Sequence, residues 1–210
     1  MQATDDSASK PIFADPTPLG LIGLSVGCAA LLPIAFGVKS ALTADGLRLA
    51  ATFCLFFGAG CQMLAGLMSF ANKNGLGGTL FTAFSFNWVM NYWSLSELAA
   101  GRVPNAAIIL SVDLCFMLVF LVMTVAFGYF SKLLLLFLLD IDILYACRIA
   151  RELTHVQAFG HVIAAATVGL MAIALYIAFA LVLNLASGRV MLPMGGPAFL
   201  PKPLAPAKPS

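Results

Sequence analysis

Long apolar stretches separated by short polar segments dominate the pattern along this chain. Each stretch is close to or above the roughly 20 residues that an α-helix needs to cross a hydrocarbon layer. The segments between them contain the Gly, Pro, Asn and charged residues that end helices. The pattern predicts an all-α, polytopic membrane protein with six transmembrane helices per protomer, over residues 18–37, 47–71, 77–100, 106–128, 131–148 and 159–187.

The two ends of the chain differ from this central region. Residues 1–14 are polar and acidic, which predicts a disordered N-terminal tail. Residues 192–210 hold six prolines and predict an extended C-terminal tail. We therefore expect a six-helix transmembrane domain over residues 15–191.

The distribution of basic residues gives only a small preference for one orientation of the helices in the membrane. With a cytoplasmic N-terminus, six Lys and Arg residues fall inside and five outside. The positive-inside rule then slightly favours cytoplasmic positions for both termini. We expect a multi-pass protein of the cell membrane, either a plasma membrane or a bacterial inner membrane.

Composition narrows the function classes. Apolar residues make up 61% of the chain and charged residues 10%, whereas a soluble domain carries about 25% charged residues. The net charge of +2 includes no basic run, which excludes nucleic acid as a partner. The five cysteines form no C-x-x-C pair, so the sequence predicts no metal site, no disulfide framework and no cofactor.

The first apolar stretch opens with Asp15, Pro16, Thr17 and Pro18. A proline favours the first turn of a helix, and Asp15 or Thr17 is suited to cap it. The free N–H groups and the positive dipole end of a helix that begins there suit a carboxylate. The alternative is an ordinary proline-initiated helix at the membrane surface.

The same stretch continues with a Gly-x-Ser-x-Gly sequence over residues 23–27, centred on Ser25. In serine hydrolases this motif lies on a strand-to-helix turn beside a general base, whereas here it lies inside an apolar helix. His161 has no spacing that supports a partnership with Ser25. We therefore interpret the motif as the Gly-x-x-x-Gly of close helix packing and expect no enzyme activity and no catalytic residue.

Several polar side chains lie inside otherwise apolar stretches. Gln62 is a lone amide in the second stretch, and Thr82, Ser85 and Asn87 lie within six residues of one another in the third. Unpaired polar groups are costly in hydrocarbon, so these must face a partner helix or a wet cavity. They either line an aqueous pathway or form interhelical hydrogen bonds, while the aromatic residues within 88–93 suit an interfacial belt.

Three carboxylates also lie in apolar stretches, namely Asp113, Asp140 and Asp142. Carboxylates within a membrane usually face the bundle interior and have a function. Asp113 is the better candidate for a proton relay, since it lies about a third of the way into its stretch. A structural partnership with Arg148, or a place near the headgroups, is the alternative.

At these residues the sequence resembles the acetate uptake transporter family, also called the succinate–acetate permease group. The family's Asn-Pro-Ala-Pro-Leu-Gly-Leu signature is matched by an Asp-Pro-Thr-Pro-Leu-Gly-Leu sequence, and its later motifs follow in order. The matching residues are Asp15, Pro16, Pro18, Leu19, Gly20, Gln62, Ala65, Gly66, Phe81, Thr82, Trp88, Pro104, Asn105 and the segment 188–195.

The resemblance implies six-helix protomers that assemble as a homo-hexamer, each with its own constricted pathway. By position, Leu24 and Phe84 match two constriction residues that are commonly Phe and Tyr in the family, so this constriction is more apolar. A third belongs around 139–143. The first signature residue is Asp15 where the family has Asn, which disfavours an anion at the entrance or favours the protonated acid.

Together, these features predict transport of a small monocarboxylate such as acetate, or of succinate or a similar acid, through the lipid bilayer. A proton-coupled carrier (symport) and a facilitative anion channel both fit. The alternatives are a channel for a neutral solute such as urea or a short amide, and a structural membrane protein without flux.

Overall fold

The computed structural model describes residues 11–200, and every regular element in that range is helical. Three of these helical elements follow one another without a break over residues 44–71 and form one continuous rod. The described residues thus form six helical rods. This confirms the predicted all-α fold with six helices. The elements are α1 (Thr17–Ala35), α2 (Ala44–Phe53), the π-helix η1 (Cys54–Cys61), α3 (Gln62–Ala71), α4 (Gly75–Ala99), α5 (Ala106–Gly128), α6 (Lys132–Thr154) and α7 (Ala158–Ser187).

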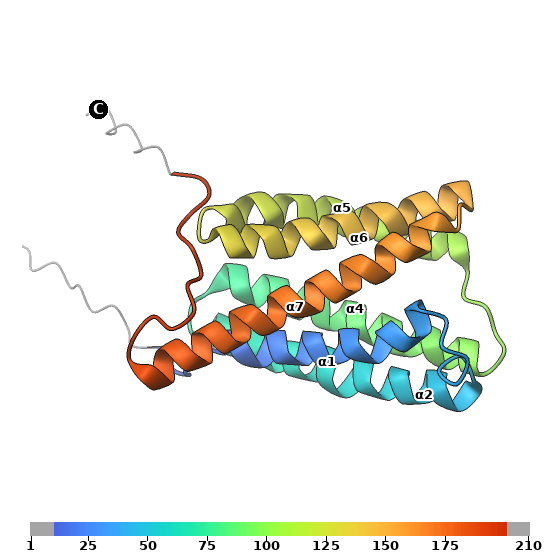
Figure 1. The fold of residues 1–210 in the computed structure, drawn as a ribbon, viewed down its shortest axis with the longest axis horizontal. Coiled ribbons are helices and arrows are strands. Elements are labelled where there is room, and N and C mark those ends of the chain that lie inside the picture. Colours follow the sequence, from blue (N-terminus) through green and yellow to red (C-terminus); the bar gives the residue numbers. More distant parts are fainter. Residues whose placement is uncertain (1–10, 201–210) are drawn as a thin grey trace, which may run out of the picture.

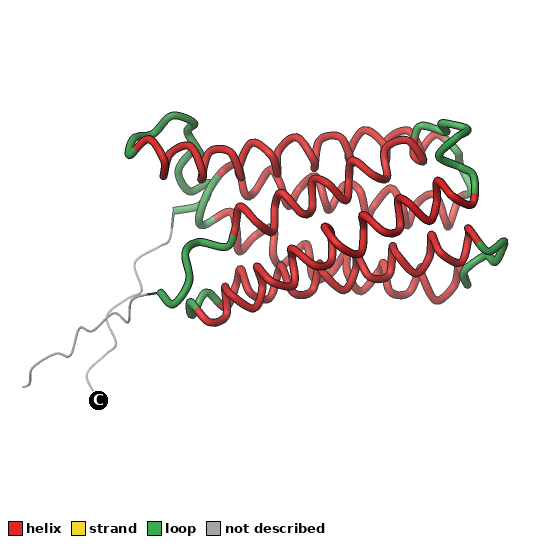
Figure 2. Tube along the Cα trace, turned by 90° about the horizontal axis from the view of Figure 1, so that it is seen from below, coloured by secondary structure: helices red, strands yellow, loops and turns green. Residues whose placement is uncertain are grey.

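The rods form one elongated bundle (Figure 1). α5 and α6 pack against each other as an antiparallel pair, while α1, the 44–71 rod and α4 form a second group. α7 crosses the bundle obliquely and packs against both α1 and α6. Loops gather at the two ends of the bundle, as Figure 2 shows. α7 therefore connects the two groups of helices.

The helix surfaces explain why this bundle belongs in a membrane. α1, the 44–71 rod, α5 and α7 are long and apolar enough to span a bilayer. α4 and α6, of 25 and 23 residues, run in the same bundle but carry more polar side chains. On α5, Leu118 and Val122 are 67% and 69% exposed. Such an apolar outer face suits lipid and not water, so the chain is a multi-pass membrane protein.

The end of α6 differs from the sequence prediction. The segment from Arg148 to His155 was expected to separate two helices, but the helix continues to Thr154. Arg and Glu are good helix formers, so the apolar stretch marks the part within hydrocarbon and not the end of the helix. His155 ends it in the left-handed conformation, with its N–H donated to the carbonyl of Arg151.

Trp88 is buried, which corrects its assignment to an interfacial belt; Tyr92 and Trp93 do point outward. Its indole lies where side chains on Gly58 of η1 and Gly27 of α1 would otherwise be. A Cβ atom at these glycines would lie 2.5 and 2.8 Å from the indole ring. The absence of two side chains thus lets α1, η1 and α4 pack closely.

The segment after α7 returns to the turn between α5 and α6. The Ser131 hydroxyl donates to the carbonyl of Met194 at 2.7 Å, and the Ala198 N–H donates to the carbonyl of Gly128 at 2.8 Å. Residues 194–199 thus contact the turn between α5 and α6. The remaining parts of the two predicted tails, 1–10 and 201–210, lie outside the described residues.

Candidate functional site

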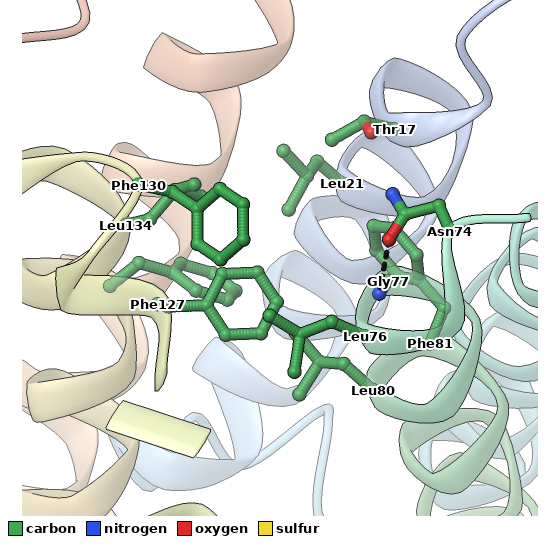
Figure 3. Close-up of a pocket in the computed structure, with 11 residues that line it drawn as sticks. Thr17, Leu21, Asn74, Leu76, Gly77, Leu80, Phe81, Phe127, Phe130 and Leu134 are labelled. Atoms are coloured by element: carbon green, nitrogen blue, oxygen red, sulfur yellow. Dashed lines mark hydrogen bonds between the residues drawn. The ribbon is translucent and has the colours of Figure 1, made fainter. Parts of the chain in front are cut away.

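A cavity of about 150 Å³ lies at the end of the bundle where α1, α4 and α6 begin. Figure 3 shows Thr17 and Leu21 of α1 on one side, with the rings of Phe127 at the end of α5 and Phe130 in the turn after it on the other. Drug-sized ligands occupy roughly 300–1,000 Å³, so this cavity suits a smaller solute. Its lining residues are Thr17, Leu21, Asn74, Leu76, Gly77, Leu80, Phe81, Phe127, Phe130, Leu134 and Phe137.

Two helix N-termini reach this cavity. At α1, the Asp15 carboxylate accepts hydrogen bonds from the Thr17 N–H at 3.0 Å and the Thr17 hydroxyl at 2.6 Å. At α4, the Asn74 side chain accepts from the Gly77 N–H at 2.9 Å. Thr17 and Asn74 are thus the polar side chains of an otherwise apolar lining.

The signature residues predicted from the sequence place α1 against this cavity. Pro16 is the N-cap residue and is buried, Pro18 lies in the first turn, and Leu19 faces outward. A Cβ atom at Gly20 would lie 2.6 Å from the ring of Phe81, which lines the cavity. The glycine therefore gives this ring its space.

The two predicted constriction residues lie one turn deeper than the cavity lining. Leu24 follows Leu21 by three residues on α1, and Phe84 follows Phe81 by three on α4. Both side chains belong to the buried core, with 1% and 5% exposed. Both side chains therefore lie in the core, one helical turn further along α1 and α4 than the cavity lining.

The candidate range for a third constriction residue lies on α6. Leu139 and Ile143 face outward, whereas Ile141 is buried. Leu138, just before the range, is also buried and follows Leu134 of the cavity lining by one turn. Leu138 and Ile141 therefore lie on the inner face of α6.

Three of the four predicted polar residues gather where α3 meets α4. The Ser85 hydroxyl donates to the carbonyl of Thr82 at 2.7 Å and lies 3.8 Å from the sulfur of Met63. Thr82 packs against Gly66 of α3. Among the described residues, the Thr82 hydroxyl and the Oε1 atom of Gln62 are buried without a hydrogen-bond partner. Asn87 is half-buried, one turn beyond Phe84.

Ser25 has no catalytic surroundings. Its hydroxyl is buried and donates to the backbone carbonyl of Leu21 at 2.8 Å, with that of Met171 at 3.4 Å. His161 is exposed. The bonding of Ser25 is that of a hydroxyl within a helix, which fits the packing interpretation.

Beyond Phe84, aromatic rings continue through the bundle. The Phe84 ring lies 4.9 Å, centroid to centroid, from Phe120 of α5, which lies 5.2 Å from Tyr145 of α6. The Arg148 guanidinium lies 5.3 Å from the centre of the Tyr145 ring. Arg148 also binds Asp113 through two hydrogen bonds, of 3.1 and 3.0 Å. The contacts thus lead from Phe84 to a charged pair.

The other two intramembrane carboxylates have different surroundings. Asp142 is buried and accepts a hydrogen bond from the Thr124 hydroxyl at 2.7 Å. Asp140 lies beside Gly169 of α7, and its Oδ2 atom has no partner among the described residues. Arg148 therefore pairs with Asp113 and with neither of these nearer residues in the sequence. No group of His, Cys, Asp and Glu within residues 11–200 is arranged to hold a metal ion.

The fold and the cavity define a multi-pass membrane protein of the channel and transporter class. The structure is similar to that of the bacterial acetate channel SatP, with a TM-score of 0.78 and 25% identity, over 87% of this chain and 99% of that one. This likeness confirms the resemblance to the acetate uptake transporter family.

A second similarity is to ammonia transport outward protein 3 of Saccharomyces cerevisiae, at 32% identity over 85 residues. The match spans 40% of this chain and 30% of the yeast protein. No family model matches the chain. Both relatives are named for transport and neither for enzyme activity.

Sequence reasoning missed most of the cavity lining. Leu76, Phe127, Phe130 and Phe137 carry no polar group that distinguishes them from lipid-facing side chains. A usable signal existed for Leu21, because it precedes the predicted constriction residue of its helix by one turn.

Proposed function

We propose that this protein conducts a small monocarboxylate such as acetate across the membrane, through the interior of each protomer. The observation that carries the proposal is the small cavity directly above the buried pair Leu24 and Phe84. The similarity to an acetate channel over 87% of the chain supports it. We propose Leu138 or Ile141 as the third constriction residue.

The chemistry of the cavity suits a short amphiphilic acid. The polar end of the acid meets the Thr17 and Asn74 side chains at the starts of α1 and α4, and its methyl group meets the rings and leucines around them. An apolar constriction then selects by size and by the cost of dewetting. Asp15 beside Thr17 favours entry of the protonated acid, because a fixed negative charge repels the anion.

The assembly and the coupling mechanism belong to the same proposal. We propose a homo-hexamer of independent protomers in the cell membrane, with both termini in the cytoplasm. The exposed apolar face of α5 is available for lipid or for a neighbouring protomer. Symport with a proton and passive diffusion both fit this pathway. Asp113 is bound to Arg148 through two hydrogen bonds, which favours the structural partnership over a proton relay.

A second candidate function is passage of a neutral small solute such as ammonia, urea or a short amide. Two observations favour it, namely the uncharged lining of the cavity and the similarity to a yeast protein named for ammonia transport. A neutral solute loses less hydration energy than an anion at an apolar constriction. Such flux would be independent of a proton gradient and insensitive to acetate.

The test is uptake of labelled acetate into proteoliposomes, with and without an inward proton gradient. We expect uptake above that of empty liposomes and competition by unlabelled acetate. Dependence on the gradient shows that a proton moves with acetate, by symport or as the protonated acid, whereas independence indicates passage of the anion through a channel. No acetate uptake by the verified oligomer would contradict the monocarboxylate proposal, and urea or acetamide uptake would then support the second candidate.

Phe84→Ala widens the proposed constriction and has a matched control on the same helix. Phe86 is 56% exposed and lies on the outer face of α4. We expect Phe84→Ala to admit longer acids such as butyrate, and Phe86→Ala to retain the wild-type preference. Equal selectivity in both variants would argue against a constriction at Phe84.

A further inference from the structure

The pair of Arg148 and Asp113 lies far from the cavity. Arg148 comes 16 residues after Lys132 at the start of α6, which corresponds to about 24 Å along the helix axis. Asp113 is likewise near the opposite end of α5, 15 residues before its last residue. The pair therefore marks the far end of the bundle.

The pair is accessible on one side only. The Arg148 side chain is 28% exposed, whereas that of Asp113 is 10% exposed. Both nitrogens that bond Asp113 belong to the planar fork that recognises carboxylates in two-point geometry. A second carboxylate would use the same geometry, and the guanidinium that Asp113 occupies is partly exposed at the far end of the bundle.

The Tyr145 side chain supplies an independent observation. It is buried, with 2% exposed, and its hydroxyl has no hydrogen-bond partner among the described residues. A buried hydroxyl without a partner is costly. Its ring contacts both the Arg148 guanidinium and Phe120, which in turn contacts the constriction residue Phe84. An unsatisfied donor therefore lies between the constriction and the arginine.

We propose that Arg148 and Tyr145 form a carboxylate-binding site at the far mouth of the pathway, with Asp113 as a resident competing carboxylate. A permeating acid binds the guanidinium and accepts a hydrogen bond from the Tyr145 hydroxyl. When the acid leaves, Asp113 forms its ion pair with Arg148 again. The competition keeps binding weak enough for release, as conduction requires. This inference rests on the proposed function and adds a specificity-determining site to it.

The test compares two variants that both lack the competing carboxylate. Asp113→Asn keeps the side-chain shape and leaves Arg148 free to bind the solute. The double variant Asp113→Asn/Arg148→Gln removes the guanidinium as well, without leaving a buried charge unpaired. In acetate uptake, we expect the half-saturation concentration to be lowest for the single variant and about tenfold higher for the double variant. The wild type should lie between them.

Arg151→Gln is the matched control, since Arg151 is an exposed arginine one turn further along α6, and it should match the wild type. Arg148→Lys keeps a positive charge beside Asp113 but loses the two-point fork, so its half-saturation concentration should rise severalfold. Arg148→Lys therefore still tests the site if the double variant Asp113→Asn/Arg148→Gln does not fold. Tyr145→Phe should raise the same quantity by a smaller factor.

The outcomes separate the two proposals. Wild-type acetate uptake together with equal half-saturation in Asp113→Asn and the double variant would overturn the Arg148 site and leave the proposed function standing. Wild-type behaviour of Arg148→Lys would overturn the site as well. No uptake by the wild type would overturn the proposed function, and the site with it.

Discussion

The two ends of the candidate pathway use different chemistry. At the cavity end, helix N-termini and side chains such as Leu21 and Phe81 surround the space, and no ionised side chain is part of the lining. At the far end, Arg148 and Asp113 form a mostly buried ion pair above Tyr145. The cavity end therefore depends on packing and hydrogen bonds, and the far end on charge.

This difference has an energetic reason. A backbone dipole and an apolar wall admit a weakly polar solute without a large loss of hydration, which suits an entrance. An ion pair costs desolvation energy when it is buried, so its presence at one end indicates a specific task or a specific helix register. Changes at the two ends should accordingly differ in size and in kind.

The largest effect is expected at the far end. Arg148→Gln leaves the Asp113 carboxylate buried without its partner, and should lower the stability by about 3 kcal/mol. Unfolding in detergent, followed by circular dichroism, measures the loss. The double variant Asp113→Asn/Arg148→Gln should recover most of it. If the stability of Arg148→Gln equals that of the wild type within error, the ion pair does not stabilise this end of the bundle.

At the cavity end, Gly20→Ala tests packing. The new methyl group would approach the Phe81 ring and Ala65, and overpacking of this kind costs about 1–3 kcal/mol. Displacement of the ring into the cavity should also reduce acetate flux. Gly75→Ala is the control, since a Cβ atom there meets nothing within 4 Å. Equal stability and flux in both variants would contradict a role for the Gly20 contact.

A smaller effect is expected from the helix cap at the same end. Asn74→Ala removes the acceptor for the Gly77 N–H and should cost about 1 kcal/mol. Because Asn74 also lines the cavity, the half-saturation concentration for acetate should rise slightly. Asn74→Asp restores the acceptor and should recover the stability. A loss of stability in Asn74→Asp equal to that in Asn74→Ala would exclude the cap as the cause.

Much of the fold follows from the sequence because membrane helices are long and apolar. The six helices appear at the predicted places, and the start of α1 at Thr17 agrees with the two flanking prolines. The π-helix η1 has no such signal in the sequence; its Gly58 lies against the indole of Trp88. The extension of α6 past Arg148 was also missed, because charged residues outside the hydrocarbon still form helix.

The candidate site is less accessible to sequence reasoning. The family resemblance, and not the residue pattern, identified Leu24 and Phe84 as constriction residues. Their position below the cavity depends on how four helices pack together, which the sequence does not show. The contact between Asp113 and Arg148 joins residues 35 positions apart, so apolar periodicity alone left it as one of several alternatives. Phe127 and Phe130 are aromatic residues at a helix end, a pattern shared with lipid-facing positions.

The most direct test of the central claim is to block the cavity covalently. In a cysteine-free background, Thr17→Cys places a thiol in the cavity lining, and Thr79→Cys places one on the exposed face of α4. Acetate uptake is measured before and after treatment with a bulky methanethiosulfonate reagent. If solute passes through the protomer interior, the reagent should abolish uptake by Thr17→Cys and leave that by Thr79→Cys unchanged. Undiminished uptake by fully labelled Thr17→Cys would contradict a pathway through this cavity.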